Sequence, residues 1–315
     1  ITFTGANFSI TTRPITLTAN SATKVYGNTD PSLTYAIEAA GTSRGLVTGD
    51  TFTGALARAV GENVGSYAIS QGSVTNSNYD ITYVPADVTI TQRPLSITAD
   101  AATKEYGATD PTFTYVITSG SLVGQDTLLG SLSRTSGANV GSYALTIGTL
   151  ANSNYNITFI PANLTITQRP VTVTAADKTK VFGSTDPPLT YSVTSGSLVG
   201  LDSFSGGISR VSGEDVDTYV IGRGTLANSN YDISFVNGTM SITRATQNAL
   251  TVTTSQVTYG TPVVLGSSGG SGTGDVTYAV TSVGTAGCSI TGGNTLSATS
   301  PGTCTVTATK AASGI

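Results

Sequence analysis

The chain has 315 residues, of which 10% are charged and 38% are hydrophobic, and its formal net charge is −4. Without a basic patch, it lacks the electrostatic signature of a nucleic-acid-binding protein. No stretch approaches the roughly 18 consecutive apolar residues that a membrane-spanning helix needs. The apolar content still suffices for packed cores, so this is not a charged, disordered chain.

Few residues suited to catalysis are present. Histidine is absent, which removes the commonest general base and a common metal ligand. Two cysteines alone do not make a zinc site, and no glycine-rich phosphate loop precedes a helix. We therefore predict that the protein is not an enzyme, and we assign it no catalytic, cofactor-binding or metal-binding residues.

Three copies of one sequence unit fill most of the chain. Each copy starts at an Arg-Pro pair, continues with an aromatic-Gly pair and a Thr-Asp-Pro corner, and approaches its end at Asn-Ser-Asn-Tyr. Repetition at the length of a domain predicts separate domains in tandem. The predicted division is the last hairpin of a preceding, truncated repeat (1–12), three repeats (13–92, 93–168 and 169–243), and a divergent Ig-like domain that is itself truncated (244–315).

The first eleven residues match a segment inside the second repeat. Ile1–Thr11 aligns with Ile157–Thr167, where the sequence predicts the closing hairpin of that repeat. We therefore interpret residues 1–12 as the last hairpin of a repeat whose beginning is absent, and the chain as a fragment of a longer array.

Within each repeat, short runs alternate apolar residues with hydroxyl-bearing residues. The opening run covers residues 15–19, and similar alternation surrounds Tyr35, Tyr67 and Val88. This alternation is typical of half-buried strands, and about six such runs in one repeat indicate an all-β unit. The predicted fold is a tandem array of small Ig-like β-sandwiches.

The stretch from Gly49 to Leu56 allows two interpretations. Phe52 and Leu56 lie four residues apart, a spacing that fits one face of a strand or one turn of a helix. A short helix would make a β-grasp-like unit, whereas a strand would make the sandwich. The Gly and Thr content disfavours a helix, so we favour the sandwich.

Recurring charged residues are assigned structural roles. Before the proline of each Thr-Asp-Pro corner, the Asp is pushed into an extended conformation in which its carboxylate can accept backbone N–H groups. These residues are Asp30, Asp110 and Asp186. A calcium site is the alternative, although the arginines at the joints have the wrong charge for it. The spacing of a second Asp and an Arg predicts one ion pair in each repeat: Asp50 with Arg58, Asp126 with Arg134, and Asp202 with Arg210.

The Asn-Ser-Asn-Tyr string predicts a turn that leads a tyrosine into a strand. The ring of each tyrosine is expected to be buried, with its hydroxyl in a hydrogen bond. These tyrosines are Tyr79, Tyr155 and Tyr231. A Lys–Asn isopeptide crosslink is a second hypothesis, because Lys24, Lys104 and Lys180 recur with these asparagines. Turn geometry explains the asparagines without such a crosslink.

The Arg-Pro pairs mark the joints between repeats. Proline fixes φ and restricts the residue before it, so short and stiff connections are expected. Neighbouring repeats should therefore touch. The joint residues are Arg13 with Pro14, Arg93 with Pro94, and Arg169 with Pro170. The fourth joint, residues 244–248, lacks the proline, which predicts a looser hinge.

Both cysteines of the chain lie in the last segment. We predict a disulfide between Cys288 and Cys304, which would stabilise the segment by roughly 3 kcal/mol in the chain-entropy model. An even number of cysteines in a domain of this kind favours oxidising surroundings.

Taken together, these motifs resemble the MBG-type repeats of large bacterial surface proteins and adhesins over residues 13–243. The residues that carry the resemblance are the Thr-Lys-x-Tyr-Gly-x-Thr-Asp-Pro string at 103–111, Val-Gly-Ser-Tyr at 140–143, Gly-Thr-Leu at 148–150 and Asn-Tyr at 154–155. Phe182 and Asp217-Thr218 depart from the pattern. The last segment resembles bacterial Ig-like repeats. The resemblance implies a secreted, cell-surface or fibre-forming array, and it implies no particular ligand.

Two functions fit these expectations. The first is a structural stalk or filament segment of a large secreted or cell-surface protein, which gives reach and stiffness for adhesion or for a matrix or fibre. The second is an adhesin whose repeats bind glycan or mucin. Tryptophan is absent and most tyrosines fall on the buried strand face, so we favour the stalk. Expected partners are neighbouring repeats of the same chain, like chains in a fibre, and host or matrix glycans, but neither nucleic acid nor membrane.

Overall fold

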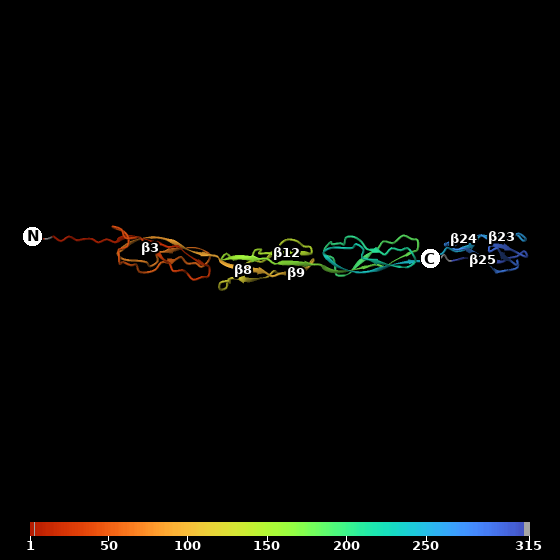
Figure 1. The fold of residues 1–315 in the computed structure, drawn as a ribbon, viewed down its shortest axis with the longest axis horizontal. Coiled ribbons are helices and arrows are strands. Elements are labelled where there is room, and N and C mark those ends of the chain that lie inside the picture. Colours follow the sequence, from red (N-terminus) through yellow and green to blue (C-terminus); the bar gives the residue numbers. More distant parts are fainter. Residues whose placement is uncertain (3, 312–315) are drawn as a thin grey trace. The chain divides into compact units, whose positions relative to one another are not determined.

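The computed structural model describes residues 1–2 and 4–311. It divides into two compact units, Ile1–Arg169 and Pro170–Ile315. The first unit contains repeats 1 and 2, and the second contains nearly all of repeat 3 together with the C-terminal domain. Every regular element in the described residues is a β-strand (Figure 1). A search of those residues finds no helix that is long and apolar enough to span a membrane.

Each repeat is a sandwich of a three-stranded and a four-stranded sheet. In repeat 1 the sheets are, in spatial order, β3 (Tyr35–Ile37), β1 (Arg13–Ala19) and β6 (Tyr79–Val84), and β2 (Ala22–Val25), β7 (Ala86–Thr91), β5 (Gly65–Ser70) and β4 (Ala57–Arg58). In repeat 2 they are β10 (Tyr115–Ser119), β8 (Arg93–Ala99) and β13 (Tyr155–Ile160), and β11 (Ser133–Arg134), β12 (Gly141–Thr146), β14 (Asn163–Thr167) and β9 (Ala102–Glu105). In repeat 3 they are β17 (Tyr191–Ser195), β15 (Arg169–Ala175) and β20 (Tyr231–Val236), and β16 (Lys178–Val181), β21 (Gly238–Thr243), β19 (Thr218–Gly222) and β18 (Ser209–Arg210).

The opening and closing segments of repeat 1 run side by side in parallel. β1 pairs with β6, beginning with Arg13 beside Tyr79, and β2 pairs with β7, ending with Val25 beside Thr91. Both segments cross from one sheet to the other, the closing one at Pro85, whose missing N–H suits a residue between two ladders. Parallel pairing makes the chain enter the repeat at one end and leave at the other, roughly 40 Å away for a dozen residues at about 3.3 Å each.

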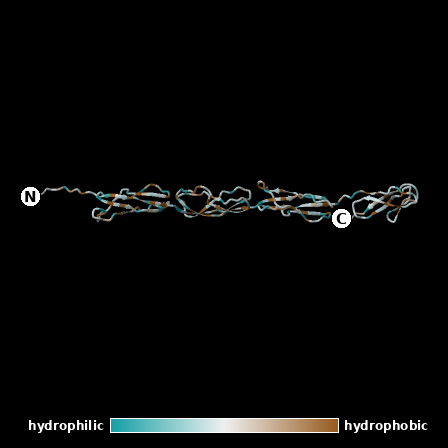
Figure 2. Ribbon diagram, turned by 90° about the horizontal axis from the view of Figure 1, so that it is seen from above, coloured by the Kyte–Doolittle hydropathy of each residue, from teal (hydrophilic) through white to brown (hydrophobic). Residues whose placement is uncertain are grey.

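The alternation in the sequence positions the core. β1 is buried at every second residue, and Ile15 and Leu17 are fully enclosed between the sheets with Val74 and Tyr79. The hydroxyl-bearing residues between them face outward. Figure 2 shows the resulting alternation of apolar and polar residues along the strands.

The stretch from Gly49 to Leu56 contains no helix. Thr53 forms an antiparallel bridge with Thr75, and the chain then continues into β4. The sandwich prediction is therefore confirmed, and the β-grasp alternative is wrong. The Gly and Thr content that disfavoured a helix is the physical reason.

In the described part of the C-terminal domain, up to residue 311, the regular elements are also all β-strands. Its sheets are β22 (Leu250–Val252) with β24 (Ser267–Gly269); β23 (Val263–Val264), β27 (Thr295–Ser297) and β26 (Ser289–Thr291); and β25 (Val276–Ser282) with β28 (Thr305–Lys310). The predicted disulfide is confirmed: Cys288 and Cys304 are bonded, with their Cα atoms 6.2 Å apart. Cys288 is buried with Leu265 and Leu296, so the crosslink is part of the domain core.

The described residues ahead of Arg13 form no strand. Phe8 and Ile10 are exposed over 91% and 97% of their surface. The assignment of residues 1–12 to a preceding repeat stays a prediction.

The core geometry gives a direct expectation for stability. Leu17→Ala should lower the free energy of unfolding of repeat 1 by about 2–5 kcal/mol, because it leaves a cavity between the sheets. Hydrogen exchange of the β1 and β6 amides measures this loss. The matched control is Val60→Ala at a fully exposed position of the same repeat, which should change stability by less than about 0.5 kcal/mol. Equal effects of the two substitutions would contradict the assigned core.

Candidate functional site

A charged cluster closes the end of repeat 1 from which the chain leaves. The Nζ atom of Lys24 lies 2.6 Å from an oxygen of Asp30 and 2.6 Å from an oxygen of Glu62. Arg58 donates two hydrogen bonds to Asp30, at 2.6 and 3.0 Å, and also pairs with Glu62. The Lys24 side chain is only 4% exposed. A cation so enclosed is costly unless it is paired, so these carboxylates are a condition for this packing.

The same cluster recurs in the other repeats with one difference. The equivalent residues are Lys104, Asp110 and Arg134 in repeat 2, and Lys180, Asp186, Arg210 and Glu214 in repeat 3. At the position of Glu62, repeat 2 has Ala138. The chain therefore contains two versions of the cluster, one with two carboxylates and one with a single carboxylate.

Arg58 also holds the turn that carries Glu62. Its guanidinium lies over the Tyr67 ring, 5.5 Å from the centroid, and donates to the carbonyl of Gly61 at 2.6 Å. Gly61 has a φ of +150°, and a Cβ atom there would lie 2.1 Å from the Tyr67 ring, so only glycine fits. The cluster thus ties the turn at residues 61–64 to the turn that follows Lys24.

The predicted ion pairs between Asp50 and Arg58, and between their equivalents, are wrong. Arg58 binds Asp30, while Asp50 accepts a hydrogen bond from the Tyr79 hydroxyl at 2.6 Å. The intervening chain follows the edge of the sandwich through the Thr53 bridge and β4. The two residues therefore lie toward opposite ends of the repeat. The same exchange of partners joins Asp126 to Tyr155, Asp202 to Tyr231, Arg134 to Asp110, and Arg210 to Asp186.

The geometry of the charged cluster disfavours both the calcium site and the Lys–Asn crosslink. The carboxylate of Asp30 faces Lys24 and Arg58 in place of the predicted backbone N–H groups, and that positive field opposes a bound calcium ion. Among the residues that the structure describes, no three His, Cys, Asp or Glu side chains are grouped to hold a metal. Lys24 is paired at the exit end of the repeat, while Asn76 accepts a hydrogen bond from the amide of Asn78 in the turn beside Arg13. The Lys and Asn residues of the hypothetical isopeptide crosslink therefore lie at opposite ends of the repeat.

Repeats 1 and 2 meet through side chains at positions of the repeated motifs. The hydroxyls of Tyr26 and Tyr155 both donate to one oxygen of Asp126, at 2.9 and 2.6 Å. Their rings also meet edge to face, with centroids 5.6 Å apart. A Cβ atom on Gly27 would lie 2.4 Å from the side chain of Val123. The glycine of the Tyr-Gly pair therefore allows the next repeat to approach.

A second contact joins two asparagines. The amide of Val64 donates to the side-chain oxygen of Asn154 at 3.0 Å, and the Asn154 side chain donates to that of Asn63 at 3.0 Å. Asn154 is only 9% exposed. Arg93 reaches back to the carbonyl of Tyr26 at 3.3 Å. The prediction that neighbouring repeats touch is confirmed at this joint.

Sequence reasoning missed the roles of Tyr26, Asn63 and Asn154. It explained the asparagines by turn geometry, and the first of each string does serve the turn, since Asn152 accepts a hydrogen bond from the amide of Asn154. One sequence signal could have indicated these roles: the second asparagine of the Asn-Ser-Asn-Tyr string recurs in every repeat, although the turn needs only the first. The joint between the first two repeats is the candidate functional site of this chain.

Comparison with known proteins identifies the repeats. The family model described as "MBG domain (YGX type)" matches residues 15–89, 95–165 and 171–241. The chain belongs to this family. No curated protein matches it. Among solved structures, it is similar to the N-terminal eight Ig domains of Down Syndrome Cell Adhesion Molecule, isoform 1.30.30, with 11% identity and a TM-score of 0.18. That match covers 95% of this chain and 54% of the other, so the chain spans about half the length of that structure.

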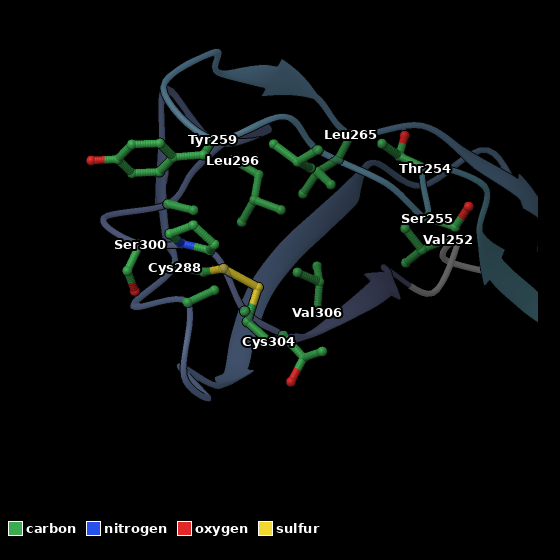
Figure 3. A pocket seen from close by; sticks show the side chains of 16 residues that line it. Val252, Thr254, Ser255, Tyr259, Leu265, Cys288, Leu296, Ser300, Cys304 and Val306 are labelled. Atoms are coloured by element: carbon green, nitrogen blue, oxygen red, sulfur yellow. A yellow bond between two sulfur atoms is a disulfide. The ribbon is translucent and has the colours of Figure 1, made fainter.

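Three MBG repeats in tandem form an architecture that is typical of non-catalytic surface proteins, and the repeats and the disulfide fit a secreted protein. The C-terminal domain adds a cavity of about 320 Å³ (Figure 3). Leu265, Leu296, Val306 and the disulfide line it. Its lining contains no Asp, Glu, Lys or Arg.

The ion pairs of each MBG repeat shift the pKa values of the carboxylates. Hydrogen bonds from Arg58, and then from Lys24, lower the pKa of Asp30 from 3.8 to about 2. The pKa values of Asp110 and Asp186 are likewise lowered to about 2 by hydrogen bonds from their own Arg and Lys partners. Lys24, and then Arg58, lower the pKa of Glu62 below its usual 4.5. Each carboxylate binds protons more weakly in the folded repeat, so its stabilisation is present above its unfolded pKa and is lost as the pH falls.

This linkage predicts that the stability of repeats 1 and 2 depends differently on pH in acid solution, because repeat 1 has a second carboxylate, Glu62, in its cluster. Glu62→Ala should weaken the dependence of the stability of repeat 1 on pH between about 4.5 and 2, because one fewer proton is taken up on unfolding. Ala138→Glu should strengthen the same dependence in repeat 2. Hydrogen exchange of the β5 and β12 amides across this pH range measures both. Unchanged slopes in both variants would contradict the cluster geometry.

The joint gives an expectation of its own. Tyr26→Phe removes a hydrogen bond to a carboxylate, and it should lower the free energy of opening the joint by about 1–3 kcal/mol. Faster hydrogen exchange of the Val64 amide, which is bonded across the joint, reports this opening. The control is Tyr83→Phe, because the hydroxyl of Tyr83 donates to the backbone carbonyl of Ile69 inside repeat 1. If the control accelerates the Val64 amide as much as Tyr26→Phe does, the assigned contact is wrong.

Proposed function

We propose that this chain is a structural spacer, a stalk or filament segment of an extracellular or cell-surface protein that holds other parts at a distance under load. The observation that carries the proposal is the parallel pairing of the opening and closing segments of the repeat. Tension enters the repeat at Arg13, where β1 and β6 begin, and leaves beyond Thr91, where β7 ends beside β2, so it acts along both parallel pairs.

The direction of the load decides how the strands resist it. β1 and β6 share six aligned residue pairs, and β2 and β7 share four. Tension from the two ends of the repeat acts along these strands, so the hydrogen bonds of each ladder are loaded together. Tension across the strands would instead break them one pair at a time. A fold in which tension from the neighbouring segments acts along its paired terminal strands is suited to bear load.

The joint supports the same function. The Tyr26–Asp126 and Asn63–Asn154 contacts connect the first two repeats through side chains, beyond the Arg-Pro connection of the backbone. Such contacts oppose bending at the joint, and a spacer needs that stiffness. The tyrosines of the joint and of the Asn-Ser-Asn-Tyr strings do not offer an aromatic platform for a sugar, since Tyr26, Tyr79 and Tyr155 are all buried.

Single-molecule pulling tests the proposal. With the full chain held by cysteines at Thr12 and Gln92, repeat 1 is loaded in shear and should unfold at high force. With cysteines at Thr12 and Ser77, the adjacent ends of β1 and β6 are pulled apart, and unfolding should occur at a markedly lower force. Forced unfolding reports the unfolding rate, so both geometries are compared at one pulling speed.

Two results would count against a spacer. Equal unfolding forces in the two geometries would show that the terminal strands do not carry the load. Specific binding of a defined glycan by the folded chain on an array would instead favour an adhesin with binding sites in its repeats.

A further inference from the structure

The end of repeat 1 at which the chain enters carries a surface that matches a contact already occupied elsewhere. We name this surface the entry face, and it consists of Val47, Asp50, Asn78 and Tyr79. These residues correspond in sequence to Val123, Asp126, Asn154 and Tyr155, which receive repeat 1 on repeat 2.

The entry face has the geometry of the occupied contact. The Tyr79 hydroxyl donates to Asp50 at 2.6 Å and accepts from the amide of Val47 at 2.9 Å. In repeat 2 the Tyr155 hydroxyl makes the same two bonds, at 2.6 Å to Asp126 and 2.7 Å from Val123. The arrangement is therefore built by each repeat for itself, before a neighbour is added.

What differs is the covering of these residues. Asn154, which bonds to Asn63 and Val64, is 9% exposed, whereas Asn78 is exposed. Val47 is 45% exposed, whereas Val123 packs against Gly27 and is half-buried. The entry face thus presents an amide and an apolar side chain to solvent at the two positions that a neighbouring repeat covers in repeat 2.

The chemistry of the occupant follows from the occupied contact. It needs a hydroxyl for Asp50, a residue without Cβ against Val47, and an amide group for Asn78. The exit end of repeat 1 offers these groups as Tyr26, Gly27 and Asn63. Repeat 3 offers Phe182, without a hydroxyl, and Asp215, without an amide, at the corresponding positions. A second copy of this chain therefore fits the entry face poorly through repeat 3.

Residues 1–12 point to the same occupant. Phe8 and Ile10, which are exposed, correspond in sequence to Leu164 and Ile166, which are 0% and 1% exposed inside repeat 2. We propose that the entry face of repeat 1 seats the Tyr-Gly end of a further MBG repeat, and that residues 1–12 supply the closing strands of that repeat in the same polypeptide.

One contact is expected to differ from the occupied joint. Arg93 reaches the carbonyl of Tyr26, but Arg13 donates to the carbonyls of Gly41 and Gly45 in the longer loop of repeat 1. The side chains of Asp50 and Asn78 therefore carry the contact at this face.

The test adds a further repeat to the full chain. A copy of residues 13–80 is placed directly before Ile1, so that residues 1–12 can complete it. In the extended chain, Asn78→Ala should accelerate exchange of the amide equivalent to Val64 in the added copy by about tenfold, the loss of one hydrogen bond. Asn154→Ala should accelerate exchange of Val64 itself by a similar factor in the unextended chain.

The possible outcomes are distinct. An extended chain in which Asn78→Ala leaves that amide unchanged, while Asn154→Ala acts on Val64, would overturn the proposal. Concentration-dependent association of the unextended chain that Asn78→Ala abolishes would also overturn it, because the occupant would then be a second copy. If the added copy does not fold, residues 93–156 placed before Ile1 repeat the test. The inference does not rest on the spacer function, which pulling experiments test separately.

Discussion

The parallel pairing of the opening and closing segments is the constraint on which the rest of each repeat depends. β1 with β6 and β2 with β7 form one continuous ribbon that changes sheets halfway along its length. The ribbon contributes strands to both halves of the sandwich, so it fixes the core and the path of the chain at once. An antiparallel pairing would return the chain to the end where it entered, and the next repeat could not then start at the far end.

The charged cluster and the joint are consecutive parts of one construction. Lys24 stands two residues before Tyr26, and Glu62 stands directly before Asn63. The ion pairs of Lys24 and Arg58 hold together the two turns that present Tyr26 and Asn63 to the next repeat. An exposed ion pair contributes little to stability by itself, but here it fixes the positions of two polar groups. Because the enclosed Lys24 cannot be left unpaired, its carboxylate partners must stay in place, and the turns that present Tyr26 and Asn63 stay in place with them.

The sequence predicted the elements well and the pairings poorly, for a physical reason. Alternation along residues 15–19 depends only on local burial, and it identified the strand and its inward face correctly. The partner of Arg58 depends on which turns the sandwich brings to one end, and a spacing of eight residues along the chain does not contain that information. The recurrence of Asp50 and Arg58 suggests an ion pair, but the edge of the sandwich separates the two residues, and Asp50 binds Tyr79 while Arg58 binds Asp30. The turn geometry of the Asn-Ser-Asn-Tyr string accounts for Asn152, whereas the contacts of Asn154 depend on the neighbouring repeat, which the motif itself does not encode.

Differences among the repeats separate the two roles of their recurring residues. Repeat 3 is followed by a segment that lacks the Asn-Ser-Asn-Tyr string, and it replaces the tyrosine of the Tyr-Gly pair with Phe182 and the asparagine of the second turn with Asp215. It nevertheless keeps Lys180 paired with Asp186 and Glu214. The groups of the charged cluster are thus retained in repeat 3, whose next segment is not an MBG repeat, while the groups that bind a neighbour are changed. The cluster therefore belongs to the folding of each repeat, and the Tyr26 and Asn63 positions belong to its connection with the next one.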